Sequence, residues 1–141
     1  MVYVSPRLFR HCPSIRNIWW SQALAEALGS NPRLTDLNLA ENYIGETKWD
    51  PVQRQQTSAA VHAFAAALES NTTMTRLDLS NNSVGDDGVL ALARSMKANK
   101  TMKALELAGN NVVTPKGREV LTQMTIRKNK RADKTRKLLG K

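Results

Sequence analysis

The chain has 141 residues, a hydrophobic fraction of 41% and a formal net charge of +9. This length fits one domain with a single core, and no apolar run approaches the roughly 20 residues of a membrane-spanning helix, so no transmembrane segment is expected. Cys12 is the one cysteine, and a chain that cannot form an internal disulfide favours an intracellular, reducing compartment over secretion.

Residues 1–18 form an expected N-terminal extension. Three arginines but no acidic residue precede Glu26, and an acid-poor, arginine-bearing start is typical of mitochondrial import sequences. Pro6 and Pro13 interrupt any long amphipathic helix in this stretch. A mitochondrial location is therefore one expectation and a cytoplasmic location is the alternative. Residues 1–4 could also add a strand to the sheet that follows.

Three later segments repeat one pattern, in which apolar residues alternate and an asparagine follows. The second and third copies start 28 residues apart, and the first and second start 40 apart because of a 12-residue insertion at 46–57. Alternate leucines point to one face of a strand, so each copy predicts a short strand with its leucines turned inward. The copies are Leu34–Ile44, Met74–Val84 and Met102–Val112.

A helix is expected before each repeated segment, because apolar residues recur there at spacings of three and four. The first helix is expected over about Trp19–Gly29, and a fourth over about 116–130 after the last strand. The apolar face repeats with the same period, as Leu24, Ala25 and Leu28, then Phe64, Ala65 and Leu68, then Leu92, Ala93 and Met96. Asn31, Asn71 and Asn99 end the helices, where a left-handed residue is common.

The pattern L-x-x-L-x-L-x-x-N-x-[IV], followed by a helix at a period of 28, resembles the leucine-rich-repeat family, specifically its ribonuclease-inhibitor-like class, over about residues 19–127. The resemblance implies an α/β fold: a short solenoid with about three parallel strands on the concave side and four helices on the convex side. Asn42, Asn82 and Asn110 follow the strands. Buried amides can satisfy backbone groups in such turns, so an asparagine ladder is expected.

The sequence holds no recognisable catalytic or metal-binding pattern. His11 and His62 have no zinc-ligand spacing with Cys12, and neither a phosphate-binding glycine loop nor a nucleophile elbow occurs. Gly85–Gly88 resembles the start of a calcium loop but lacks the later ligands, and its two aspartates suit a helix N-terminus. We therefore expect no enzyme activity, no cofactor, no metal and no small-molecule substrate.

Protein contacts are expected on the solvent-facing side of the strands and in the insertion, which is expected to form a loop. Neighbouring strands lie about 4.8 Å apart, so Asp78 and Glu106 should form an acidic spot beside Asn38. Trp49 in the insertion is a candidate contact residue, and its alternative role is to pack over its own helix. The predicted protein-binding residues are Asp36, Asn38, Arg76, Asp78, Glu106 and Trp49.

A basic tail at residues 128–141 ends the chain. With the adjoining Arg127 it holds eight basic residues and the single acid Asp133, which is +7 of the total charge. Such a run binds phosphates in a salt-sensitive, sequence-independent way, and no aromatic residue interleaves to stack on bases. RNA backbone is the first predicted partner and an acidic protein surface the alternative. The predicted contacts are Arg127, Lys128, Lys130, Arg131, Lys134, Arg136, Lys137 and Lys141.

These features together predict a non-catalytic structural subunit of a large assembly. In the first hypothesis the repeat docks on proteins and the tail contacts RNA, as in a ribonucleoprotein such as a mitochondrial ribosome. In the second, the chain is a scaffold subunit of a protein-only assembly, such as an axonemal, cytoskeletal or respiratory complex, and the tail meets an acidic protein surface.

Overall fold

The computed structural model describes residues 2–3, 16–42, 44, 51–112 and 114–123. Its elements in chain order are β1 (Val2–Tyr3), α1 (Arg16–Ser30), β2 (Asp36–Asn38), α2 (Pro51–Ser70), β3 (Arg76–Asp78), α3 (Asp86–Ala98) and β4 (Ala104–Glu106). Residues 115–123 are helical as well. Trp49, the basic tail and most of the N-terminal extension lie outside the described residues.

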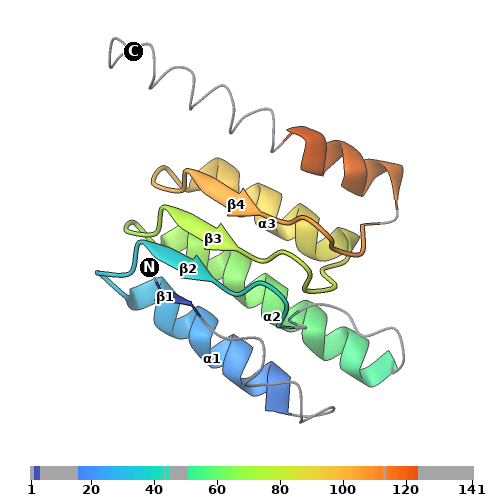
Figure 1. The fold of residues 1–141 in the computed structure, drawn as a ribbon, viewed down its shortest axis with the longest axis horizontal. Coiled ribbons are helices and arrows are strands. Elements are labelled where there is room, and N and C mark those ends of the chain that lie inside the picture. The colour runs from blue at the N-terminus through green and yellow to red at the C-terminus, as the bar shows by residue number, and fades with distance from the viewer. Residues whose placement is uncertain (1, 4–15, 43, 45–50, 113, 124–141) are drawn as a thin grey trace.

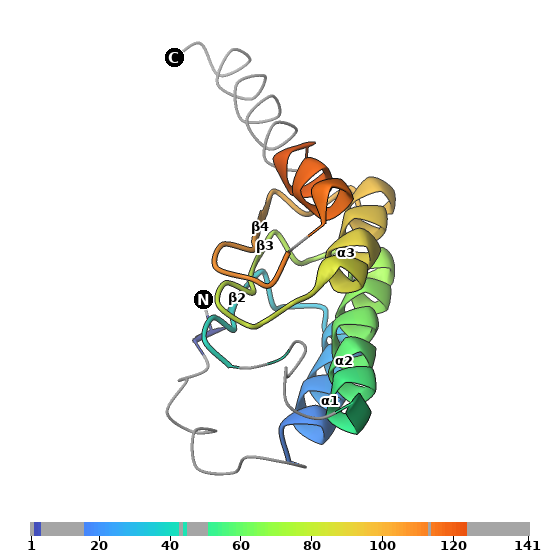
Figure 2. The same cartoon turned by 90° about the vertical axis from the view of Figure 1, so that its right-hand side faces the viewer.

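The four strands form one parallel sheet in the order β1-β2-β3-β4, so each strand lies beside its neighbour in sequence (Figure 1). The register pairs equivalent repeat positions, with Leu37 opposite Leu77 and Leu77 opposite Leu105. The described helices all lie on one side of this sheet (Figure 2). The short α/β solenoid that the repeat predicted is therefore confirmed. β1 is the additional strand that the sequence allowed within residues 1–4.

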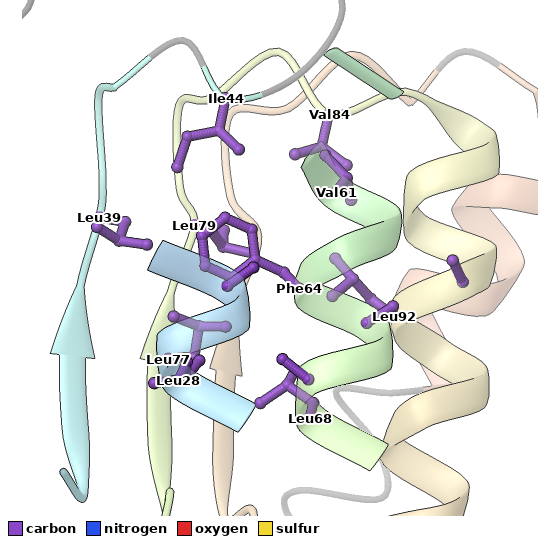
Figure 3. Packing of buried hydrophobic residues seen from close by; sticks show 14 of the residues in the cluster. Leu28, Leu39, Ile44, Val61, Phe64, Leu68, Leu77, Leu79, Val84 and Leu92 are labelled. Atoms are coloured by element: carbon purple, nitrogen blue, oxygen red, sulfur yellow. The ribbon is translucent and has the colours of Figure 1, made fainter. Parts of the chain in front are cut away.

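The core lies between the sheet and the helices, where inward leucines of the strands meet the apolar helix faces (Figure 3). Leu77, Leu79 and Phe64 are each 0% exposed, and burying one such side chain stabilises the fold by about 1.5–3 kcal/mol. The last strand differs, because all three residues of β4 are only half-buried, Leu105 among them. The core therefore thins toward β4, one of the two edge strands of the sheet.

The expected asparagine ladder is present in the turns after the strands. The Asn82 side-chain oxygen accepts the backbone N–H groups of Asn42 at 2.9 Å and Ile44 at 3.2 Å. Asn110 does the same for the N–H groups of Asn82 and Val84, both at 2.9 Å. Because each rung joins one repeat to the preceding one, the ladder couples adjacent repeats as well as closing their turns.

A second asparagine ladder, not predicted from the sequence, joins the ends of the helices. The side-chain nitrogen of Asn99 donates to the carbonyl oxygens of Leu68 at 2.5 Å and Asn71 at 2.8 Å. In the same way, the side-chain nitrogen of Asn71 donates to the carbonyl of Leu28 at 2.7 Å. These bonds satisfy carbonyl groups that a helix end leaves without an intrahelical partner.

The expectation of a left-handed residue at these helix ends is wrong for Asn99. Its φ of −68° and ψ of 131° are extended, and its side-chain oxygen accepts the N–H groups of Thr101 at 2.8 Å and Met102 at 2.7 Å. The Asn99 side-chain amide therefore supplies the hydrogen bonds that end the helix, in place of a left-handed C-terminal residue. The chain then turns directly into the next strand.

The insertion at 46–57 is helical in its second half, although a loop was expected there. α2 begins at Pro51 and has 20 residues, whereas α3 has 13. Proline suits the first turn of a helix because its φ is already helical and its missing N–H is not needed there. The residues that follow include glutamines and an arginine, which are good helix formers. Part of the insertion thus lengthens the second convex helix.

Candidate functional site

The open face of the sheet carries a row of three polar side chains in register. Asn38 on β2 lies opposite Asp78 on β3, which lies opposite Glu106 on β4. All three are half-buried. Because neighbouring strands are about 4.8 Å apart, the row places two carboxylates side by side next to an amide. We refer to Asn38, Asp78 and Glu106 as the polar row.

The strand positions on either side of the polar row differ from it in character. Asp36, Arg76 and Ala104 form the preceding row, with Arg76 exposed and the other two half-buried. Beyond the polar row each strand continues into small residues, namely Ala40, Ser80 and Ala108.

Two members of the polar row also stabilise the turn that follows their strand. The side-chain oxygen of Asn38 accepts the backbone N–H of Ala40 at 2.9 Å. One carboxylate oxygen of Asp78 accepts the N–H of Ser80, also at 2.9 Å. Such turns hold the side chain in one orientation. The row is therefore a preoriented polar surface as well as a structural feature.

The structure brings together five of the six predicted protein-binding residues on this face: Asp36, Asn38, Arg76, Asp78 and Glu106. The sixth, Trp49, and the eight basic residues of the predicted RNA contact lie outside the described residues. His62 is exposed on α2. Asp86 and Asp87 lie in the first turn of α3, which confirms their predicted place at a helix N-terminus.

A grouping of basic residues at the amino ends of the strands was not predicted from the sequence. Five exposed basic residues lie near the amino ends of the strands, namely Arg33, Arg76, Lys97, Lys100 and Lys103. Acidic residues lie at or beyond the carboxyl ends, namely Glu41, Asp78, Asp86, Asp87 and Glu106. The signal was available, because these five basic residues all fall in the segments that lead into the strands, where the acidic residues are Asp36 and Glu69.

Other chemistry is not evident in the part of the chain that the structure describes. Among those residues, no three His, Cys, Asp or Glu side chains gather closely enough to hold a metal ion. None of the described helices combines the length and the hydropathy needed to span a bilayer.

Comparisons with known proteins agree with this architecture. A family profile described as Leucine Rich repeat matches residues 70–93 and 98–121. The structure is similar to the solved structure titled "Leiomodin-1 Actin-Binding Site 2 (ABS2)", with a TM-score of 0.57 and 19% sequence identity over 98% of this chain and 89% of that chain. No curated protein matches the sequence. At this identity the structural likeness shows a shared fold.

The stacked repeats, the two asparagine ladders and the single parallel sheet define a short α/β solenoid. The two profile matches show that the chain contains leucine-rich repeats, and the structural likeness shows the same fold.

Proposed function

We propose that the protein is a non-catalytic module that binds a partner protein through the open face of its sheet. The observation that carries this proposal is the polar row, in which Asn38, Asp78 and Glu106 lie in register and half-exposed. No described helix packs over this face (Figure 2). Paired carboxylates on adjacent strands attract cationic side chains, so the partner segment that fits here is basic or polar.

The leiomodin-1 structure supplies a defined first probe for this proposal. Its title assigns an actin-binding site to leiomodin-1, and the shared fold makes monomeric actin a reasonable protein to test by titration. Binding that is lost when the polar row is reversed in charge would support actin as the partner. Binding that is indifferent to the polar row would place any actin contact elsewhere on the chain.

The general test compares two charge-reversal variants of the full chain. Asp78→Arg with Glu106→Arg alters the polar row, and Glu26→Arg with Glu69→Arg alters exposed residues of α1 and α2 by the same net charge. Partner proteins recovered with the wild type should bind the first variant at least about tenfold more weakly and the second variant unchanged. Equal recovery with both variants, or equal loss, would contradict the proposal.

A second contact is proposed for the basic tail, supported by the +7 charge of residues 127–141. RNA backbone is the first candidate, as in a ribonucleoprotein such as a mitochondrial ribosome, and the acid-poor N-terminal extension supports that compartment. The alternative is a protein-only scaffold in which the tail meets an acidic protein surface.

Co-sedimentation before and after nuclease treatment separates these two candidates. RNA binding predicts that the protein leaves large particles when the RNA is digested, and retention would favour the protein-only scaffold. Deleting Arg127–Lys141 should also flatten the salt dependence of association, whereas an unchanged slope would remove the tail from the mechanism. Organelle fractionation tests the mitochondrial location directly.

A further inference from the structure

We propose that the surface at the amino ends of the strands binds an acidic segment of a partner protein. The basic rim that would bind it consists of Arg33, Arg76, Lys97, Lys100 and Lys103. The proposal rests on the proposed function in naming the chemistry of a protein partner, but it concerns different residues from the polar row.

The basic rim is assembled from three successive repeats. Arg33 follows α1, Arg76 begins β3, and the three lysines lie at the end of α3 or just before β4. All five side chains are exposed. The acidic residues in the same connecting segments are Asp36, which is half-buried, and Glu69. Positive charge therefore dominates this edge of the molecule.

Folding does not account for most of these charges. Lys97 lies in the last turn of α3, where a cation favours the helix dipole. However, α1 and α2 end without any basic residue in their last turns, and Lys100 and Lys103 lie beyond the end of α3. Within the described residues, none of the five rim side chains forms an ion pair. Their charges are thus available to a partner.

The neighbouring charges favour a polypeptide over a nucleic acid as the ligand. Arg76 lies two residues before Asp78 on β3, a spacing of about 6.6 Å and within the Debye length of about 8 Å at physiological salt. A phosphate backbone carries a negative charge at every nucleotide. A nucleic acid that ran from the basic rim across the open face of the sheet would therefore be repelled by the carboxylates of the polar row. A polypeptide can place acidic residues over the rim and neutral or basic residues beyond it.

The composition of the rim supports the same choice. The connecting segments 29–36, 69–76 and 97–104 contain no aromatic residue, so they offer no platform on which single-stranded bases could stack. Three of the five rim residues are lysines, whose compact ammonium groups lie on flexible stems and can each bind a separate carboxylate. The partner is therefore inferred to be an acidic stretch of protein that continues over the open face.

Site-resolved cross-linking of the full-length protein tests this inference. The probe is a synthetic peptide of glutamates interspersed with serines, joined to nearby lysines by a carbodiimide and located by mass spectrometry. Cross-links at Lys97, Lys100 or Lys103 are expected to be more frequent than at Lys116, an exposed lysine that follows the carboxyl end of β4. Cross-links confined to the basic tail, or equally frequent at Lys116, would overturn the proposal. Because this map uses the wild type, it does not depend on the folding of any variant.

A matched pair of variants measures the contribution of the rim. Lys100→Glu with Lys103→Glu should weaken rim-localised peptide binding about tenfold, because rim charges act through long-range attraction. Lys116→Glu with Arg118→Glu makes the same change of net charge on the helical residues 115–123. This control pair should change the affinity for the peptide at the rim less than twofold. Equal effects of the two pairs would overturn the proposal.

Two further measurements separate the alternatives. If oligouridylate cross-links to the rim and displaces the glutamate peptide from it, the rim is a nucleic-acid site and the proposal is wrong. Asp78→Arg with Glu106→Arg should leave the rim cross-links in place while removing partners of the polar row. If partners are lost only with Asp78→Arg and Glu106→Arg, the proposed function is supported and the rim proposal is wrong. If partners are lost only with Lys100→Glu and Lys103→Glu, the rim proposal is supported and the polar row is not the binding surface.

Discussion

The side-chain oxygen of Asn82 accepts the backbone N–H of Asn42, a residue 40 positions earlier in the chain, at 2.9 Å. Its side-chain nitrogen donates to the carbonyl of Leu39, in the same preceding repeat, at 2.8 Å. One buried amide therefore completes the turn of a neighbouring repeat. This makes the ladder a nearest-neighbour interaction of the kind that governs the stability of repeat proteins.

Replacing Asn82 with alanine should lower the free energy of unfolding by about 3 kcal/mol. The side chain is 0% exposed, so its loss leaves buried backbone donors and acceptors without a partner. Asn111→Ala is the control, because Asn111 is half-exposed and makes no side-chain hydrogen bond within the described residues. Urea denaturation measures both variants, and a similar small change for the two would show that the ladder contributes little.

Leu79→Ala should destabilise the fold by about 2–5 kcal/mol, the usual cost of truncating a buried leucine. Leu79 is 0% exposed in the centre of the core. Leu105→Ala, at a half-buried position on the edge strand β4, should cost about 1 kcal/mol. Thermal and urea unfolding give the comparison. A negligible loss for Leu79→Ala would mean that the inward register of the strand is wrong.

The sequence was sufficient to predict the sheet, the helix faces and the first asparagine ladder, because each depends on residues that recur with the period. The ladder at Asn71 and Asn99 was missed for the opposite reason. Its hydrogen bonds join residues such as Asn99 and Leu68, 31 positions apart, whereas helix ends were interpreted through local capping alone. Contacts between repeats become visible only once the repeats are stacked.

The candidate site was predictable in part for related reasons. Strand alternation placed Asp78 and Glu106 on the solvent face, and the register then put them side by side. The basic rim was not recognised because Arg33 and Lys103 are far apart in sequence, and net charge does not show how charges group in space. The helical start of α2 at Pro51 was missed because a length difference between repeats was interpreted as a loop.

Gly109→Ala should destabilise the protein by about 1–2 kcal/mol. Gly109 has a φ of +69°, and an added Cβ would meet the side-chain oxygen of Asn81. Gly29→Ala is the matched control within α1, because its Cβ would make ordinary contacts with Ser70 and Ala67 at 3.5 and 3.7 Å. That change should be neutral or stabilising by up to about 1 kcal/mol. Reversed signs in chemical denaturation would contradict the turn geometry.

Thr114→Val should loosen the helical segment 115–123 while leaving the central repeats intact. The Thr114 hydroxyl donates to a carboxylate oxygen of Asp86 at 2.5 Å and accepts the backbone N–H of Gly117 at 3.1 Å. It thus caps the helical segment and ties it to the first turn of α3. Valine keeps the branched shape but removes both bonds, at an expected cost of about 1–2 kcal/mol.

Hydrogen exchange followed by mass spectrometry localises the effect of Thr114→Val. Amide exchange should accelerate in residues 115–123 and remain unchanged in β2 and β3, since local opening of a terminal unit does not require global unfolding. Thr122→Val is the control on the same segment, because the exposed Thr122 hydroxyl donates only to the Arg118 carbonyl at 2.9 Å. It should change stability by less than about 0.5 kcal/mol. Equal acceleration by the two variants would show that the hydrogen bond from the Thr114 hydroxyl to Asp86 does not anchor this segment to the solenoid.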